Sequence, residues 1–249
     1  MNKKKLNIGL INLGCPKNTV DAECMLSTLD NFVLVNSPEK ADFIIINTCG
    51  FLKKARDESE KAIKDMLYVR QKNKKLKIIV AGCFVEKEKE KLIKKYRDVY
   101  AWVGVNDFTQ LNEIIKKGGE FLKESPFIYS AKDRRALLNG ISAYVKIAEG
   151  CNKKCSFCLI PQIKGEYRSR KIEDIVKEIK ILIDSGVKEI NLISQDTSYY
   201  GVDIYNKKAL IDLVQEILKN IKKFFWLRIM YLYPDVSIIK GLIDIMKKD

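Results

Sequence analysis

Short apolar runs alternate with longer amphipathic segments along the first 120 residues. The runs are continuous rather than alternating in polarity, which is typical of strands buried on both faces of a parallel sheet. Strands are predicted over Leu6–Asn12, 42–47, 76–81 and 101–105, and helices over 19–26, 53–70, 85–96 and 108–117. Asp21 and Glu23 fall in the first turn of the first predicted helix, where the helix dipole favours acidic side chains. This order predicts an α/β domain with a parallel sheet covered on both faces.

A second alternation begins at Ser142. Strands are predicted over 143–148, 188–194 and 225–231, and helices over 171–184, 209–221 and 236–246. Repeated strand–helix units of this kind build barrels whose chemistry lies at the carboxyl ends of the strands. Three strands cannot close a barrel, so we expect the first part of a partial (βα) barrel, and of a longer protein.

Residues 121–141 lack either pattern. Gly118-Gly119, Pro126 and Asn139-Gly140 interrupt the periodicity around and within this stretch, as a linker would. The predicted organisation is therefore an N-terminal domain over 1–120, a linker over 121–141 and a second domain over 142–249.

Composition narrows the class of protein. Hydrophobic residues make up 47% of the 249 residues and charged residues 31%, as in soluble globular proteins. The weak apolar run after Met1 and the lack of any stretch of roughly 20 apolar residues argue against a secretory signal and a membrane span. Seven cysteines do not resemble a secreted disulfide scaffold, so a cytoplasmic location is expected.

The charge of +14 favours an acidic partner such as RNA. Only eight of the 46 basic residues are arginine, however, so a general drift toward lysine explains the charge equally well. The chain has no histidine, which removes the usual general base near neutral pH and leaves thiolates as its soft metal ligands.

Cys151, Cys155 and Cys158 form a C-x3-C-x2-C loop directly after the strand predicted over 143–148. Three thiolates on one loop can hold three corners of a four-iron, four-sulfide cube and leave one iron open for a small molecule. A structural zinc site is the alternative, but it needs a fourth ligand, and neither a nearby cysteine nor any histidine supplies one. Three merely buried cysteines are the other alternative.

Cys15, Cys49 and Cys83 follow three successive predicted strands at a constant spacing of 34 residues. The carboxyl ends of parallel strands meet at one edge of a sheet, so these thiols are expected to converge on a second three-cysteine cluster. Adjacent glycines at 14, 50 and 82 let the backbone turn sharply there. Burial as small apolar residues remains the alternative, and it is the interpretation preferred for Cys24, inside the first helix.

These stretches together resemble the radical S-adenosylmethionine (SAM) methylthiotransferase family. The resemblance is to the RimO type, which modifies an aspartate of the small-subunit ribosomal protein S-twelve. The tRNA-modifying branch of this family typically has other residues at two places, Pro16-Lys17 and Ser194-Gln195-Asp196. Both differences favour the branch that modifies the ribosomal protein. The matching segments are Leu13-Gly14-Cys15-Pro16-Lys17-Asn18, Asn47-Thr48-Cys49-Gly50-Phe51, Ala81-Gly82-Cys83, 143–151, Gly165-Glu166-Tyr167-Arg168-Ser169-Arg170 and Ile193-Ser194-Gln195-Asp196-Thr197.

The resemblance implies two 4Fe-4S clusters and SAM as cofactors. Cys151, Cys155 and Cys158 would hold the cluster that binds SAM and generates a radical, which removes hydrogen from the aspartate β-carbon. Cys15, Cys49 and Cys83 would hold an auxiliary cluster that carries the inserted sulfur. The fold implied is an N-terminal methylthiotransferase domain followed by the first part of a radical-SAM partial TIM barrel. Implied partners are the small ribosomal subunit and an electron donor such as flavodoxin or ferredoxin.

Supporting residues are open to two interpretations each. Phe157 is expected near the SAM adenine or in the core, and Gln195 is expected to contact SAM or substrate or to stabilise a loop. Arg168, Arg170 and Arg228 either bind carboxylates or form surface or inter-domain ion pairs. Other functions left open are a tRNA adenosine methylthiotransferase, a non-catalytic two-cluster protein and a zinc-binding module.

Overall fold

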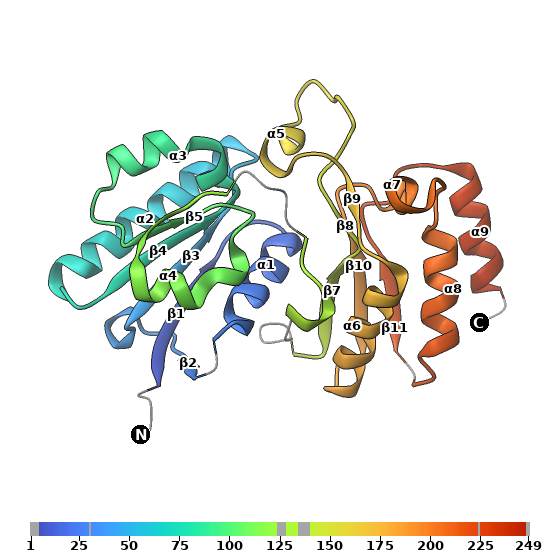
Figure 1. Cartoon of the computed structure of the whole chain (residues 1–249), viewed down its shortest axis with the longest axis horizontal. Coiled ribbons are helices and arrows are strands. Elements are labelled where there is room, and N and C mark those ends of the chain that lie inside the picture. The colour runs from blue at the N-terminus through green and yellow to red at the C-terminus, as the bar shows by residue number, and fades with distance from the viewer. Residues whose placement is uncertain (1–4, 30, 124–127, 134–139, 224, 248–249) are drawn as a thin grey trace. The chain divides into compact units, whose positions relative to one another are not determined.

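The computed structural model describes residues 5–29, 31–123, 128–133, 140–223 and 225–247. The chain divides into two compact units (Figure 1). The first comprises Met1–Phe127 together with Cys155–Lys164, and the second comprises Ile128–Lys154 together with Gly165–Asp249. Each unit contains its own parallel sheet, as the two alternating patterns predicted.

The sheet of the first unit has six strands in the order β2-β1-β3-β4-β5-β6, all parallel. The strands are β1 (Leu6–Asn12), β2 (Phe32–Leu34), β3 (Phe43–Thr48), β4 (Lys77–Gly82), β5 (Ala101–Val103) and β6 (Gly119–Phe121). The helices are α1 (Pro16–Ser27), α2 (Lys53–Lys72), α3 (Cys83–Lys95) and α4 (Leu111–Lys117), with 3-10 turns at Pro38–Lys40 and Phe108–Gln110.

The sequence predicted four of these strands and missed β2 and β6. Both lie at an edge of the sheet, have three residues, and are partly or largely exposed. β2 carries a short apolar run, Phe32-Val33-Leu34, that the prediction overlooked. β6 is Gly119-Glu120-Phe121 and has no such run, so hydrophobic periodicity could not reveal it.

Buried side chains on alternate strand positions build the core of the first unit. Ile44, Ile46, Ile78 and Val80 share one cluster with residues of α2 and α3 such as Ile63. Figure 1 shows these two helices along the sheet. Successive strand residues point to opposite faces, so the intervening buried isoleucines of β3 and β4 face the other side.

The start of α1 differs from the prediction. The helix begins at Pro16, which suits the first helical position because it needs no N–H partner there. Asp21 and Glu23 are therefore not in the first turn, and the predicted stabilisation by the helix dipole is wrong for them. Both side chains are buried instead, at 2% and 0% exposure.

The second unit has three parallel strands in the order β11-β10-β7. The strands are β7 (Ser142–Lys146), β10 (Glu189–Ile193) and β11 (Trp226–Ile229), and the helices α6 (Ile172–Asp184), α8 (Leu210–Asn220) and α9 (Val236–Met246). Buried residues of α6 and α8 at helical spacing pack with Val145, Ile190 and Leu192 of the sheet. The amphipathic pattern predicted this packing.

The strand predicted over 143–148 is divided in the structure. Its end forms β8 (Ala148–Glu149), which pairs antiparallel with β9 (Arg168–Ser169). Two short helices were also not predicted, α5 (Ile160–Lys164) and α7 (Val202–Tyr205). Within the described parts of the chain, every helix is too short or too polar to cross a membrane.

Candidate functional site

Three neighbouring strands deliver Cys15, Cys49 and Cys83 to one edge of the first sheet. The strands β1, β3 and β4 are adjacent, and the register aligns Asn12 with Asn47 and Thr48 with Gly82 at their carboxyl ends. Each cysteine follows its strand within three residues. Cys15 is the N-cap of α1, and Cys83 is the first residue of α3.

The loops that carry these cysteines are in direct contact. A Cβ atom added at Gly14 would lie 2.7 Å from the Cβ of Cys49 and 3.2 Å from its Sγ. A Cβ added at Gly50 would lie 2.6 Å from the carbonyl oxygen of Cys83. Only glycine permits this approach at both positions, and Gly14 also has a φ of +96° that other residues rarely adopt.

Among these thiols, that of Cys49 lies in an environment that disfavours the thiolate. Burial raises the pKa of the Cys49 thiol, a backbone hydrogen bond from Phe51 opposes that rise, and the nearby Cys15 adds to it. All three cysteines are half-buried. A cationic iron would overcome the raised pKa because metal ligands bind as thiolates and release their protons. The donor set and its packing therefore fit a cluster held by three cysteines.

The second cysteine group lies in the loop after β8. Gly150 precedes it with a φ of +79°, and a Cβ there would lie 2.0 Å from the carbonyl oxygen of Glu166. The N–H of Cys151 donates to the Gly165 carbonyl at 3.1 Å, and the N–H of Lys153 donates to the Cys151 Sγ at 3.4 Å. Cys151 is thus fixed against the segment before β9.

Cys155 and Cys158 occupy a turn in which the N–H of Cys158 donates to the Cys155 carbonyl at 3.0 Å. Cys155 is exposed, and Cys151 and Cys158 are half-buried. Among the cysteines that the structure describes, Cys24 alone is fully buried, as expected for a core thiol. Mere burial as small apolar residues therefore does not describe either group of three.

A cavity of about 120 Å³ lies beside Cys151 at the carboxyl end of β10. The Lys153 ammonium lies 2.7 Å from the Asp196 carboxylate and 3.2 Å from the centre of the Tyr233 ring. Burial raises the pKa of the Tyr167 hydroxyl, which donates to the Asp196 carbonyl at 2.8 Å. The cavity is lined by Cys151, Asn152, Lys153, Tyr167, Asp196 and Tyr199.

The predicted supporting residues lie close to this region or at the surface. Gln195 is half-buried and immediately precedes Asp196, and it is Asp196 that lines the cavity. Phe157 is 78% exposed, so the core-packing alternative for it is wrong. The sequence did not predict a role for Lys153 or Tyr167, although Lys153 lies inside the C-x3-C-x2-C loop and Tyr167 inside the segment 165–170. No periodic pattern distinguishes a cavity-lining residue from its neighbours.

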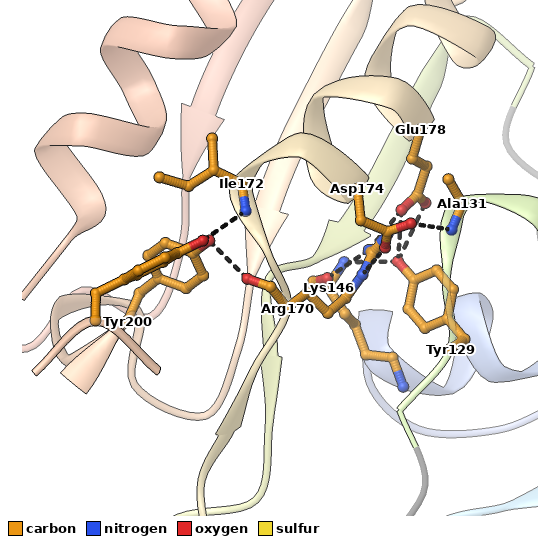
Figure 2. A network of polar contacts seen from close by, with 9 residues as sticks. Tyr129, Ala131, Lys146, Arg170, Ile172, Asp174, Glu178 and Tyr200 are labelled. Atoms are coloured by element: carbon orange, nitrogen blue, oxygen red, sulfur yellow. Dashed lines mark hydrogen bonds and ion pairs between the residues drawn. The ribbon is translucent and has the colours of Figure 1, made fainter. Parts of the chain in front are cut away.

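The arginines take part in local pairs. Arg170, only 3% exposed, contacts Asp174 at 2.6 Å and Glu178 at 2.5 Å, and Tyr129 donates to Glu178 at 3.1 Å (Figure 2). This pair is buried within the second unit, which corrects the expectation of a surface or inter-domain pair for Arg170.

Arg228 forms an exposed pair with Glu189 at 2.8 Å, as the surface alternative predicted. Arg168 donates to the Glu166 carbonyl at 2.7 Å.

Across the described ranges, no three Cys, Asp or Glu side chains surround a position for a single metal ion. Thiolates on three corners of a cube bind three different irons and stand farther apart than ligands of one ion. The fit of each cysteine group to a cluster therefore rests on the loop contacts given above.

Two family models match the chain. Residues 7–104 match the model described as "Uncharacterized protein family UPF0004", and residues 145–248 match the "Radical SAM superfamily". The first match includes Cys15, Cys49 and Cys83, and the second includes Cys151, Cys155 and Cys158.

Two curated relatives are named "Ribosomal protein uS12 methylthiotransferase RimO". The protein from Dictyoglomus thermophilum is 43% identical over 246 residues, which cover 96% of this chain and 56% of the relative. That from Clostridioides difficile is 40% identical over 251 residues, covering 98% and 56% respectively. The chain thus spans a little over half the length of these relatives.

A solved structure shares the fold. It is the radical S-adenosylmethionine methyltransferase TsrM from Kitasatospora setae, with cobalamin and a [4Fe-4S] cluster bound. The TM-score is 0.56 at 11% sequence identity, over 87% of this chain and 51% of that one.

Proposed function

Because this chain belongs to the radical SAM methylthiotransferase family, we propose that it forms part of an enzyme that adds a methylthio group to the β-carbon of an aspartate in ribosomal protein uS12. The observation that carries the proposal is the contact between the loops of Cys15, Cys49 and Cys83, in a chain that also has the C-x3-C-x2-C loop. A simple SAM-cleaving enzyme would need only the second of these features.

We assign the auxiliary cluster to residues 1–120 and the SAM cluster to a radical-SAM domain over 142–249, with 121–141 as the linker. Cys15, Cys49 and Cys83 would hold the auxiliary 4Fe-4S cluster, which would supply the sulfur for insertion. When bound, the second cluster and SAM supply one-electron chemistry that activates an aliphatic C–H bond beyond the reach of acid–base catalysis. Its ligands would be Cys151, Cys155 and Cys158.

The protein's own residues would bind and orient SAM. Asp196 and Lys153 bring a carboxylate and an ammonium to the cavity beside Cys151, charges that complement the amino and carboxylate groups of SAM. Tyr167 donates its hydroxyl hydrogen to the Asp196 carbonyl at 2.8 Å and so would hold that residue in place beside the cavity. The exposed ring of Phe157 would stack on the adenine of SAM. Gln195 would contact SAM or the substrate.

The partners follow from the substrate. We propose the small ribosomal subunit as the partner, with RNA contact favoured by the charge of +14, and a cytoplasmic location where ribosomes are found. A reducing protein such as flavodoxin or ferredoxin would supply the electron.

Anaerobic reconstitution with iron and sulfide tests the cluster assignment. Cys151→Ala and Cys49→Ala should each lower the iron content by about four atoms per chain, one cube each. Cys24→Ala is the matched control, because this buried thiol is expected to bind no iron. Zinc in place of iron, or an unchanged iron content in either variant, would contradict the assignment.

Activity separates the remaining alternatives. The reduced protein should convert SAM to 5′-deoxyadenosine, and Cys151→Ala should abolish this while Cys49→Ala preserves it. Methylthio transfer is then measured by mass on uS12 and on tRNA in parallel. A gain on tRNA alone would replace the ribosomal substrate with tRNA adenosine, and absence of SAM cleavage would favour a non-catalytic two-cluster protein.

A further inference from the structure

Two buried asparagine side chains form hydrogen bonds at the strand ends from which the Cys15 and Cys49 loops emerge. Asn18, in the first turn of α1, is 2% exposed, and Asn47, near the end of β3, is 0% exposed. A primary amide is costly to bury unless its polar atoms form hydrogen bonds. The partners of these two amides therefore define what the side chains hold together.

The Asn18 amide joins the first two cysteine loops. Its Nδ2 donates to the Leu13 carbonyl at 2.7 Å and to the Thr48 carbonyl at 3.1 Å. Leu13 lies two residues before Cys15, and Thr48 directly precedes Cys49. Both N–H bonds of one side chain are thus used to fix these two loops against each other, and the Cys15 thiol lies 4.0 Å from the Asn18 Oδ1.

The Asn47 amide joins the strand ends to α1. Its Nδ2 donates to the Asn12 Oδ1 at 3.0 Å and to the Asn18 carbonyl at 2.7 Å. The neighbouring Thr48 hydroxyl donates to the Ala81 carbonyl at 2.6 Å, two residues before Cys83. The hydrogen bonds therefore run from α1 through β1 and β3 to β4, along the edge where all three cysteines emerge.

We infer that Asn18 and Asn47, here called the amide bracket, are positioning residues for the auxiliary cluster. They fix the Cys15 and Cys49 loops against each other before iron arrives, and the Thr48 hydroxyl extends the network to the strand that ends at Cys83. The inference rests on the proposed function, which assigns Cys15, Cys49 and Cys83 to that cluster. Second-layer hydrogen bonds that hold ligands in place raise metal affinity because less ordering remains when the metal binds.

Asn18→Asp tests the bracket with almost no change of shape. The aspartate loses both N–H donors and places a negative charge against the Leu13 and Thr48 carbonyls. In a Cys151→Ala, Cys155→Ala, Cys158→Ala background, the auxiliary cluster is the one cluster expected. Reconstituted iron should fall there from about four atoms per chain to fewer than about one, with loss of the reduced-cluster EPR signal.

Asn206→Asp is the matched control, since it makes the same charge change at an exposed position that follows α7 in the second unit. It should retain the auxiliary cluster in full. Asn18→Asp is also made with all six cluster cysteines present, where the SAM cluster and the helical circular dichroism should persist.

The outcomes are distinct. Retention of auxiliary iron in Asn18→Asp overturns the inference, and so does joint loss of both clusters with the helical signal, which would mean a general folding defect. Failure of the triple-alanine background itself to bind iron counts against the proposed function instead.

Discussion

At the scale of single residues, Gly150 is the position where a methyl group should do most harm. An alanine there meets the Glu166 carbonyl at 2.0 Å and must also adopt a φ of +79°. Gly186 is the matched control, because it has a φ of +106° with nothing within 4 Å. Gly186→Ala should cost about 1–2 kcal/mol of strain. Gly150→Ala should cost clearly more by urea unfolding, and it should also lower SAM-cluster iron, whereas equal costs would refute the close contact.

Individual site residues were predictable where chemistry restricts the residue type. The position of Cys15, Cys49 and Cys83 directly after predicted parallel strands led us to expect that they converge, and the strand register places the three strand ends at one edge. Lys153 was not predicted, because its ion pair with Asp196 joins positions far apart in the sequence. A lysine in a lysine-rich chain carries no signal of its own.

At the scale of elements, the buried pairs of Arg170 hold the start of α6 (Figure 2). Glu178→Gln keeps the shape but removes a charge that is 1% exposed, so the free energy of unfolding should fall by about 3 kcal/mol. Glu189→Gln, in the exposed pair with Arg228, is the control and should leave the free energy of unfolding almost unchanged, because solvent screens a surface pair. Urea denaturation measures both. Similar costs would mean that the buried network contributes no more than a surface pair.

The long elements were predictable because each has a period. The helix predicted over 236–246 and the strand over Leu6–Asn12 match the structure at both ends. Some short elements, such as β8, β9 and α5, were missed because two to five residues without a distinct apolar run show no period. The end of the strand predicted over 143–148 is one example, because Ala148 belongs to β8 and pairs with Ser169.

At the scale of the whole molecule, alternation predicted two parallel sheets but not which chain segments join each unit. Cys155–Lys164 lies with the first unit, although it interrupts the sequence of the second. The reason is a buried contact between residues 143 positions apart, from Lys164 to Asp21 of α1. No local sequence pattern predicts such a pair, and the prediction had assigned Asp21 to the first turn of a helix instead.

That contact yields a last prediction. The two side chains are each 3% exposed and lie 3.2 Å apart, with the Lys164 ammonium also 5.4 Å from the Phe108 ring centre. Lys164→Met keeps the apolar stem but leaves a buried carboxylate without this cation, at a cost of about 3–5 kcal/mol. Hydrogen exchange should then rise in both α1 and 155–164, while α8 in the other unit stays protected. Lys164→Arg keeps the charge and should restore protection. Unchanged exchange in α1 would show that the segment is held by other contacts, and that Cys155 and Cys158 do not depend on this ion pair for their place.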